Sequence, residues 1–528
     1  LTINTTTLAL TAPVLTSGGN VSITADSVAY PDAIESNGGD ITLTARVGGI
    51  SAVDDGDASA AVLRTTAASG NASGSIVLDA TGASGSIVVG EVDASGADNS
   101  AGAGSLGGDI TLRSTGALTY SSVDASGGDG TGAAGGAAGD IRLVRDTDTG
   151  LLLSGPVTAL GGSGSTAGRG GIVTLEVPGD GGIGQPLSGA TIRTRRLVLD
   201  SHGDDDLPSL TGEFAFEDPN NLISELSLQT RGDTIGVHRQ DVRLVSDTDL
   251  TVVGASHASR GFMSFDVGSH TLAVQADLDS GGDALMVTAG RFTSDSSGTL
   301  STRGGELDLT GVTGRIQIGG EVSTSGGDVN LGAGSGELTL SEPVFTGGGR
   351  FAAFGTAFTL DDNSSDSGLV SGGGDIDLRG ITGKVSIAED IDTGGGDFFS
   401  GGTDLRFEEL FDFLGQDSLR TNGGLVDLSG HTGDIESLLS RYRIITGGGD
   451  FIATGVKNIS LIPLPGFGIW SIDTDGRSGH DAGSVTIEAS NAVAVTGISA
   501  AGSAGKAGGA VDLRAGGKLA VYGIDTRG

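Results

Sequence analysis

The sequence contains no cysteine, so neither disulfides nor thiolate metal ligands are available to this chain. Aromatic residues make up only 4% and there are just two Met, which excludes a thick core built from large side chains. No apolar run reaches the ~18 residues that a membrane-spanning helix requires, so we expect no membrane span. Glycine is instead abundant, at 98 of 528 residues, and 37% of the chain is hydrophobic. This composition is too apolar for a disordered chain and favours thin layers of small and β-branched side chains.

Positive charge is also scarce. The chain has 29 Lys and Arg against 66 Asp and Glu, which gives a formal net charge of −37. Nucleic acid is an unsuitable partner, because binding it needs clustered Lys and Arg that displace counterions. Anionic membrane surfaces are disfavoured for the same reason. An acidic surface of this kind favours solubility and attracts cations.

A short glycine motif recurs through the second half of the chain. TGGGDF occurs at Thr393–Phe398 and at Thr446–Phe451, with TGGGRF at Thr346–Phe351. The last glycine of each glycine pair that precedes a strand-like segment recurs in steps of 22, 22, 25, 22, 28 and 25 residues, at Gly305, Gly327, Gly349, Gly374, Gly396, Gly424 and Gly449. Alternating apolar and polar residues follow most of these glycines, as in DIDL at Asp375–Leu378, which indicates half-buried strands. Because a fixed period of this length is typical of solenoids, we predict an all-β parallel β-helix (a β-solenoid) of about 22–32 residues per coil.

The period of about fifty residues between TGGGDF copies corresponds to two coils. LRGITGKV (Leu378–Val385) and LSGHTGDI (Leu428–Ile435) share the frame L-x-G-x-T-G-x-[IV] and alternate with the TGGGDF turns. We interpret TGGGDF as one corner of the coil, where glycine allows positive φ and a close approach of neighbouring corners. The Asp that follows is expected to accept a hydrogen bond from a nearby backbone N–H.

Loop composition divides the chain into three predicted regions. Residues 1–205 are expected to form a solenoid with Gly/Ala-rich loops, as in Ala125–Ile141. Residues 206–275 contain less Gly and are expected to form irregular or decorated coils. Residues 276–528 are expected to form the 22–28-residue coils, and the array looks cut within a repeat. Within them, Arg406–Gln416 has apolar residues at helical spacing, which predicts a short amphipathic helix.

The corner aspartates are the candidate metal ligands. Asp375, Asp397 and Asp450 follow equivalent glycines, so they should fall in one column with a coil spacing of ~4.8 Å. We expect Asp375 and Asp397 to be neighbours and Arg350 to lie between Asp328 and Asp375. Stacked carboxylates repel unless they are protonated, paired or screened, so the column predicts weak Ca²⁺ binding. The alternative is an arginine-interrupted face that water screens, and no other cofactor is expected.

Two further groups of residues are candidates for chemistry or binding. Asp377 and Asp427 should share an outward column two coils apart, a separation of ~10 Å that is at the edge of the range for inverting glycosidases. No Lys, Arg or His set accompanies them in the sequence, and the overall pattern argues against an enzyme. The candidate binding residues are the RGD tripeptide Arg231, Gly232 and Asp233 and the apolar-loop residues Phe467 and Trp470.

The repeated GGDITL turns at Gly38–Leu43 and Gly107–Leu112, the Gly/Ala-rich loops and the absence of cysteine resemble the large bacterial exoproteins of the filamentous haemagglutinin type. That family includes two-partner-secreted and autotransporter adhesins. The resemblance implies a right-handed parallel β-helix that is exported across an outer membrane and displayed on a Gram-negative-type cell.

The expected function is therefore that of an extracellular structural or adhesive stalk, fibre or filament. Its expected partners are other copies of itself, surface glycans or host receptors. About twenty coils would form a rod of roughly 100 Å. A carbohydrate-active β-helix enzyme (a polysaccharide lyase or hydrolase) and a glycan-binding module are the alternatives.

Overall fold

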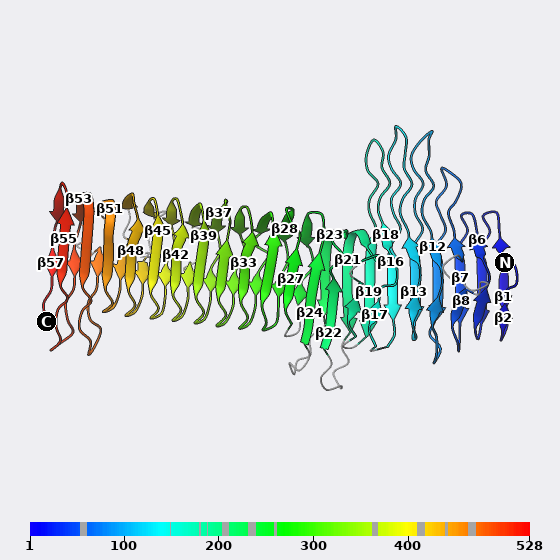
Figure 1. Ribbon diagram of the computed structural model, residues 1–528, viewed down its shortest axis with the longest axis horizontal. Coiled ribbons are helices and arrows are strands. Elements are labelled where there is room, and N and C mark those ends of the chain that lie inside the picture. The colour runs from blue at the N-terminus through cyan, green and yellow to red at the C-terminus, as the bar shows by residue number, and fades with distance from the viewer. Residues whose placement is uncertain are drawn as a thin grey trace. The chain divides into compact units, whose positions relative to one another are not determined.

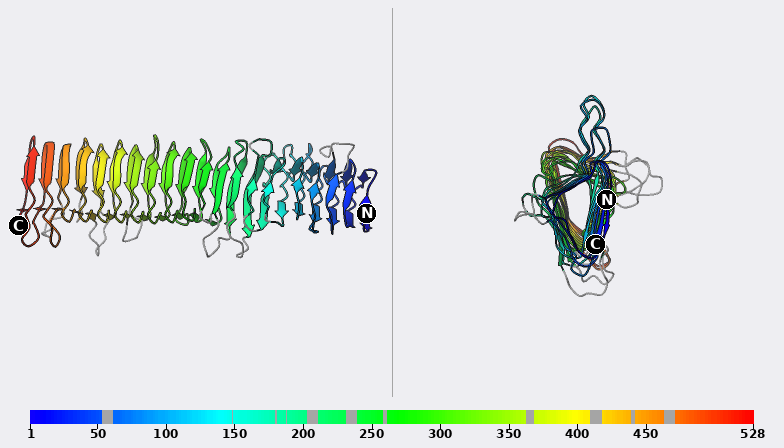
Figure 2. Two further views of the ribbon diagram at one scale, coloured as in Figure 1. Left: turned by 60° about the horizontal axis from the view of Figure 1, so that its bottom comes forward. Right: turned by 90° about the vertical axis from the view of Figure 1, so that its right-hand side faces the viewer.

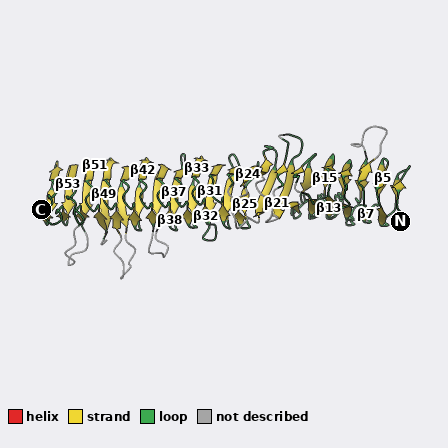
Figure 3. Cartoon of the chain, turned by 90° about the horizontal axis from the view of Figure 1, so that it is seen from below, coloured by secondary structure: helices red, strands yellow, loops and turns green. Residues whose placement is uncertain are grey.

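The structure is a computed structural model that describes residues 1–52, 61–147, 149–178, 181–186, 188–202, 211–230, 239–257, 261–361, 368–408, 418–438, 442–462 and 471–528. Over these residues the chain forms only strands, turns and loops (Figure 3), and every strand pairing is parallel, which confirms the all-β parallel β-helix. The chain divides into two compact units, Leu1–His270 and Thr271–Gly528. Each unit is a stack of coils with short strands on the coil walls (Figure 1).

In the first unit, three rows of strands succeed one another around the coil. The first row consists of β1 (Thr2–Asn4), β4 (Val21–Ala25), β7 (Ile41–Ala45), β10 (Ile76–Ala80), β13 (Ile110–Ser114), β16 (Ile141–Arg145), β19 (Ile172–Pro178), β21 (Ile192–His202), β23 (Leu222–Thr230) and β25 (Leu250–Val252). The second row consists of β2 (Leu8–Ala9), β5 (Val28–Tyr30), β8 (Ile50–Ala52), β11 (Ile87–Val88), β14 (Leu118–Thr119), β17 (Leu151–Leu152), β20 (Ile183–Gly184), β22 (Thr211–Phe216), β24 (Arg239–Val245) and β27 (Met263–Asp266). The third row consists of β3 (Val14–Leu15), β6 (Ala33–Glu35), β9 (Val62–Arg64), β12 (Glu91–Asp93), β15 (Ser122–Asp124) and β18 (Val157–Ala159), and β26 (Ser256–His257) is the remaining strand.

The second unit repeats the three-row arrangement. Its first row consists of β30 (Leu285–Ala289), β33 (Leu307–Val312), β36 (Val329–Gly332), β39 (Phe351–Gly355), β42 (Ile376–Ile381), β45 (Phe398–Gly402), β48 (Val426–His431), β51 (Phe451–Leu461), β53 (Val485–Val495) and β55 (Val511–Ala515). Its second row consists of β28 (Thr271–Val274), β31 (Arg291–Ser294), β34 (Ile316–Ile318), β37 (Glu337–Leu340), β40 (Ala357–Leu360), β43 (Val385–Ile387), β46 (Leu405–Glu408), β49 (Asp434–Leu438) and β56 (Leu519–Val521), with the second halves of β51 and β53 between the last two. Its third row consists of β29 (Leu278–Asp279), β32 (Leu300–Ser301), β35 (Val322–Ser323), β38 (Val344–Phe345), β41 (Leu369–Val370), β44 (Ile391–Asp392), β47 (Ser418–Arg420), β50 (Arg443–Ile445), β52 (Ile472–Asp473), β54 (Ile498–Ser499) and β57 (Ile524–Asp525).

The strand register gives the length of each coil. In the second unit the pairs Leu307↔Val329 (329 − 307) and Val329↔Phe351 (351 − 329) both give 22 residues, as predicted. In the first unit the pairs Val21↔Ile41 (41 − 21) and Ile41↔Ile76 (76 − 41) give 20 and 35 residues. Coil length therefore varies more widely than the predicted 22–32 residues. The strands of these coils, such as β4, β7 and β10, all have five residues, so the difference lies in the connecting segments.

The register also explains why TGGGDF recurs at every second coil. The first inward position of successive coils is occupied by Val329, Phe351, Ile376, Phe398, Val426, Phe451 and Val485, and all of them are fully buried. Phenylalanine thus alternates with a β-branched residue along the axis of the stack. Alternation of large and small side chains fills the narrow interior to native density without overpacking it.

The corner itself is held by a row of buried hydroxyl groups. In the second unit these belong to Thr302, Thr324, Thr346, Ser371, Thr393, Thr421, Thr446 and Thr474, all at most 1% exposed. The Thr346 Oγ1, for example, donates to the Gly349 carbonyl oxygen at 2.5 Å and lies 3.0 Å from the carbonyl oxygen of Ser371 in the next coil. The hydroxyls therefore close each turn and also connect neighbouring coils, a role that the sequence did not reveal.

The three glycines of the turn meet three different requirements. The first adopts φ near 65°, as at Gly372 and Gly394, and Asn422 occupies the same position with φ 54°. The second, as at Gly373, adopts φ 122°, which L side chains rarely tolerate. The third, Gly374, faces the previous corner, where an added Cβ would lie 2.0 Å from the Gly349 carbonyl oxygen. Only the first position can accept another residue.

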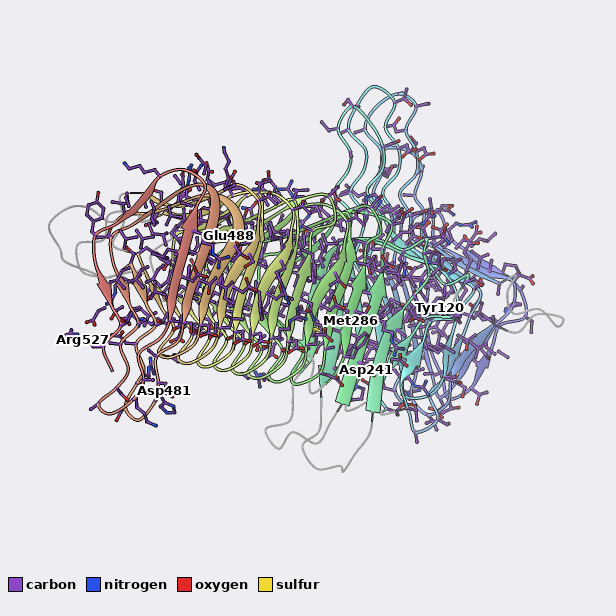
Figure 4. The ribbon with its side chains drawn as sticks, turned by 60° about the vertical axis from the view of Figure 1, so that its left-hand side comes forward. Tyr120, Asp241, Met286, Asp481, Glu488 and Arg527 are labelled. Carbon is purple, nitrogen blue, oxygen red and sulfur yellow. The ribbon has the colours of Figure 1, made fainter. Side chains whose placement is uncertain are left out.

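Residues 95–107, 126–138 and 160–170 of the first unit form three stacked loops, which we call the fin. The loops project from the coil wall over β12 to β18 (Figures 1 and 2), and they carry few long side chains (Figure 4). The two arms of each loop bond to each other, as in Gly136 N–H to Gly128 O at 2.8 Å, and neighbouring loops bond in parallel, as in Gly135 N–H to Thr166 O at 2.9 Å. A Cβ on Gly104 or Gly136 would lie 1.8 Å from a carbonyl oxygen of the neighbouring loop. Close backbone packing therefore explains the Gly/Ala composition of these loops.

Two expectations from the sequence concern local structure: a helix at Arg406–Gln416 and irregular or decorated coils at 206–275. The predicted helix at Arg406–Gln416 is wrong over Arg406–Glu408, which end strand β46 with the Phe407 side chain fully buried. A single inward aromatic in a coil with bonded neighbours on both sides outweighs the helical spacing of the residues that follow. The rest of that segment, 409–417, lies outside the described residues. The described parts of 206–275 form parallel strands in register with their neighbours, such as β22 with β24.

Candidate functional site

The corner aspartates form the expected column. Backbone bonds from Phe351 N–H to Asp375 O and from Ile376 N–H to Asp397 O place Asp375 between Arg350 and Asp397, as predicted. Leu425 follows Asp397 in the column, and Asp450 comes next, so Asp450 is not adjacent to Asp397.

Each of the three corner carboxylates accepts a hydrogen bond from a backbone N–H of the next coil, so none of them faces only other carboxylates. The Asp397 N–H donates to Asp375 Oδ1 at 2.8 Å, and the Leu425 N–H donates to Asp397 Oδ1 at 2.7 Å. Ser484 N–H bonds Asp450 Oδ1 in the same way, at 2.7 Å. These bonds give each of the three carboxylates a backbone partner and link the coils. No cluster of three or more His, Asp or Glu suited to a metal ion occurs in the described ranges, and Ca²⁺ binding by Asp375, Asp397 and Asp450 stays a prediction.

A tighter charged cluster surrounds Asp377 on the outer face of β42. Its Oδ2 accepts bonds from Arg350 Nη2 at 2.6 Å and from Arg379 Nη2 at 2.7 Å. The Arg379 guanidinium lies 4.1 Å from the centroid of the Phe399 ring. Burial disfavours the charged form of Asp377, but the bonds from Arg379 and Arg350 outweigh it and lower the pKa of Asp377 to about 2. The expectation that no basic residues gather here is wrong, because long side chains from adjacent coils converge on one column.

The surroundings of Asp377 bear on the alternative that the protein is a carbohydrate-active enzyme. Asp377 pairs with Phe399, and Phe399 pairs with Asp427, so the two carboxylates share a column two coils apart, as predicted. An inverting glycosidase needs one carboxyl group that is protonated near neutral pH. Asp377 is held ionised by two arginines, and the Phe399 ring lies in the coil between the carboxylates. Asp377 is therefore unsuited to the role of general acid, and the two-coil separation lies at the edge of the range for inverting glycosidases.

A second polar site is a shallow depression on the outer face of β43, β46 and β49. It has a volume of about 240 Å³ and is lined by Lys384, Asp404, Leu405, Arg406, Asp434 and Glu436. Its charged groups pair between coils, as in Arg406 Nη2 to Glu436 Oε2 at 3.5 Å, and the Asp434 N–H bonds Asp404 Oδ1 at 2.8 Å. Pairs of this exposure contribute little stability individually, and together they form a screened, nearly neutral surface.

One pair of buried polar side chains was not anticipated. Ser400 Oγ and His431 Nε2 lie 2.9 Å apart, and the two residues are 0% and 1% exposed. His431 occupies the frame position that is Val312 or Ile381 in other coils, so the sequence signal was a histidine at an apolar position. Its Nδ1 is buried with no hydrogen-bond partner. Burial lowers the pKa of His431 to about 4, although the nearby Asp404 charge acts in the opposite direction. Because both groups lie inside the coil, they have no access to a substrate.

The remaining sequence candidates lie outside the described residues. These are Arg231, Gly232 and Asp233 of the RGD tripeptide and Phe467 and Trp470 of the apolar loop.

No family model, no curated protein and no solved structure matches this chain. Within the described ranges, no helix is long and apolar enough to cross a membrane.

Proposed function

We propose that this protein is a non-catalytic, extracellular β-solenoid that builds a surface stalk, fibre or filament or carries adhesion. The observation that supports this most directly is the continuity of bonding between coils. Strand ladders, corner hydroxyls and corner carboxylates all connect one coil to the next along each unit. Such a stack resists separation along its axis and presents a long, regular outer surface.

The outer surface is consistent with a scaffold. Several of its charged residues pair between neighbouring coils, and the fin extends from the wall as a candidate contact surface. The resemblance to haemagglutinin-type exoproteins supports a location on the surface of a Gram-negative-type cell. Surface glycans, host receptors or further copies of the chain are then its partners, and weakly bound Ca²⁺ on the corner column would screen its negative charge.

Electron microscopy of native material, combined with antibody labelling of intact cells, tests this proposal. We expect fibres or stalks at the cell surface that label without permeabilisation. Protein that labels only after the cells are opened would contradict the proposal.

The rival function is a carbohydrate-active enzyme, which the shared column of Asp377 and Asp427 favours. Purified protein incubated with acidic and neutral polysaccharides should release no new reducing ends or unsaturated products. Turnover that Asp427→Asn abolishes would replace the structural role with an enzymatic one.

A further inference from the structure

A cluster of basic side chains at the foot of the fin departs from the acidic character of the protein. Arg169, Arg193, Arg195 and Arg196 gather there, and we call them the fin foot. Arg195 Nη1 and Arg196 Nε both bond Glu225 Oε2, at 2.8 and 2.6 Å. The side chains of Arg169 and Arg193 are exposed and have neither a hydrogen-bond nor an ion-pair partner among the described residues. Asp140 also lies at this corner, because its Oδ1 accepts a bond from the Ile172 N–H at 2.8 Å and Ile172 pairs in register with Arg196. Four positive charges therefore meet two negative charges in a chain of net charge −37.

The backbone fixes the position of these arginines. Arg193 lies between the buried Ile192 and Thr194 on β21, so its side chain points outward, and it pairs in register with Thr158 at the base of the outgoing arm of the last fin loop. Arg195 lies between the half of β21 that pairs with β18 and the half that pairs with β19. Its Nε donates to the Gly170 carbonyl oxygen at 3.1 Å. Arg169 directly precedes Gly170 on the returning arm. The arginines therefore lie where the last fin loop meets the coil wall.

The last fin loop forms one wall of this corner, because the coil that contains β21 carries no loop to cover it (Figure 1). Four backbone N–H groups of the preceding loop donate to carbonyl oxygens of the last loop: Gly127 to Leu160, Gly130 to Ser163, Gly135 to Thr166 and Ala138 to Arg169. The equivalent amides of the last loop belong to Gly161, Gly164, Ala167 and Gly170, and none of them has a partner in the described structure. Because the loops stack in parallel, these N–H groups point away from the fin toward the β21 side. The stretch 160–170 also contains no acidic residue.

We propose that the fin foot is a binding site for an acidic polysaccharide that bears carboxylate groups. Guanidinium groups bind carboxylates through paired hydrogen bonds, and unpaired backbone amides add further donors for the same oxygens. The foot spans about two coils, or ~10 Å, and over that length duplex DNA would bring roughly six phosphates against a local excess of about two positive charges. A polyuronate, with one charge per sugar, matches the local charge better and suffers less repulsion from the acidic remainder.

This inference deepens the proposed surface role and rests on it for its biological setting, but its test uses purified protein and can fail separately. Binding of fluorescent oligogalacturonate is measured for the wild type, for Arg169→Ser/Arg193→Ser and for Arg291→Ser/Arg315→Ser. Arg291 and Arg315 are a matched control, because their side chains are exposed, adjacent in register and without partners among the described residues, but no loop stands beside them. Both variants lose the same charge.

We expect the wild type to bind oligogalacturonate and not a neutral maltooligosaccharide of the same length. Arg169→Ser/Arg193→Ser should weaken binding by about tenfold or more, while the control pair changes it little. Equal weakening in both variants, no binding by the wild type, or equal binding of the neutral sugar would overturn the proposal. So would tighter binding of duplex DNA, or self-association that only Arg169→Ser/Arg193→Ser abolishes. Surface fibres that persist in such a case would leave the structural role intact.

Discussion

A single buried imidazole is expected to govern much of the acid response of the second unit. His431 has a pKa of about 4 in the fold against 6.5 in an unfolded chain, because burial disfavours its charged form. Its neutral form therefore contributes full stability above pH 6.5, and this contribution is lost as the pH falls from about 6.5 to about 4. The total is about 3 kcal/mol, from ~1.4 kcal/mol per pKa unit. Replacing His431 with Val, the residue at the equivalent position 312, should remove this loss.

The measurement is the urea midpoint of unfolding at pH 7 and at pH 4.5. The wild type should lose stability between these values, and His431→Val should lose clearly less. Asp377 does not interfere, because its lowered pKa places its own loss between about pH 4 and about pH 2. The exposed His480 supplies the control, since His480→Gln should behave like the wild type. An unchanged pH response in His431→Val would show that other groups dominate.

At the level of the turn, the three glycines of the corner should differ sharply in their tolerance to substitution. Gly374→Ala places a Cβ 2.0 Å from the Gly349 carbonyl oxygen, so neighbouring coils must separate. We expect a loss of about 2–4 kcal/mol, in the range of overpacking combined with a broken backbone bond. Gly372→Asn should cost less than about 1 kcal/mol, because Asn422 already adopts φ 54° at the same position.

Hydrogen exchange of the corner amides compares the two variants directly. Gly374→Ala should increase exchange at the turns of both adjoining coils, whereas Gly372→Asn should leave them protected. If the two variants exchange alike, the contact between Gly374 and Gly349 does not hold the corners together.

The elements of this fold were largely predictable from the sequence, because strands repeat with a fixed period. The corners at Gly349, Gly374 and Gly396, the inward Phe and the neighbouring Asp375 and Asp397 all follow from that period. The period does not reveal which contacts long side chains make with neighbouring coils. Arg350 and Arg379 converge on Asp377 from two coils, and the strand at Arg406–Glu408 is fixed by its bonded neighbours rather than by its own spacing. The shared hydroxyl bonds of the corner threonines were missed for the same reason.

At the level of the whole stack, the strands of each coil in the second unit pair with strands of the coil before it and of the coil after it. Stability of such an array is approximately a sum of coil and interface terms, so whole coils should be removable. Deletion of Arg350–Gly396 removes two coils and joins Gly349 to Asp397, which recreates the TGGGDF corner. Val329 then meets Phe398 in the core column, so large and small side chains still alternate.

We expect this in-phase deletion to fold, with a thermal midpoint within about 5 °C of the full chain, since it loses repeated contacts without creating new ones. Deletion of Arg350–Val385 is the contrasting variant, because it joins Gly349 to Ser386 in the middle of β43 and removes a first-row strand from its coil. That loss leaves the backbone groups of β36 and β45 without partners and exposes Val329 and Phe398, so the second variant should aggregate or unfold at a much lower temperature. Circular dichroism and size-exclusion chromatography compare the two. Equal tolerance of both deletions would mean that the corner does not set the phase of the coils, whereas failure of both would mean that the stack folds as one indivisible unit.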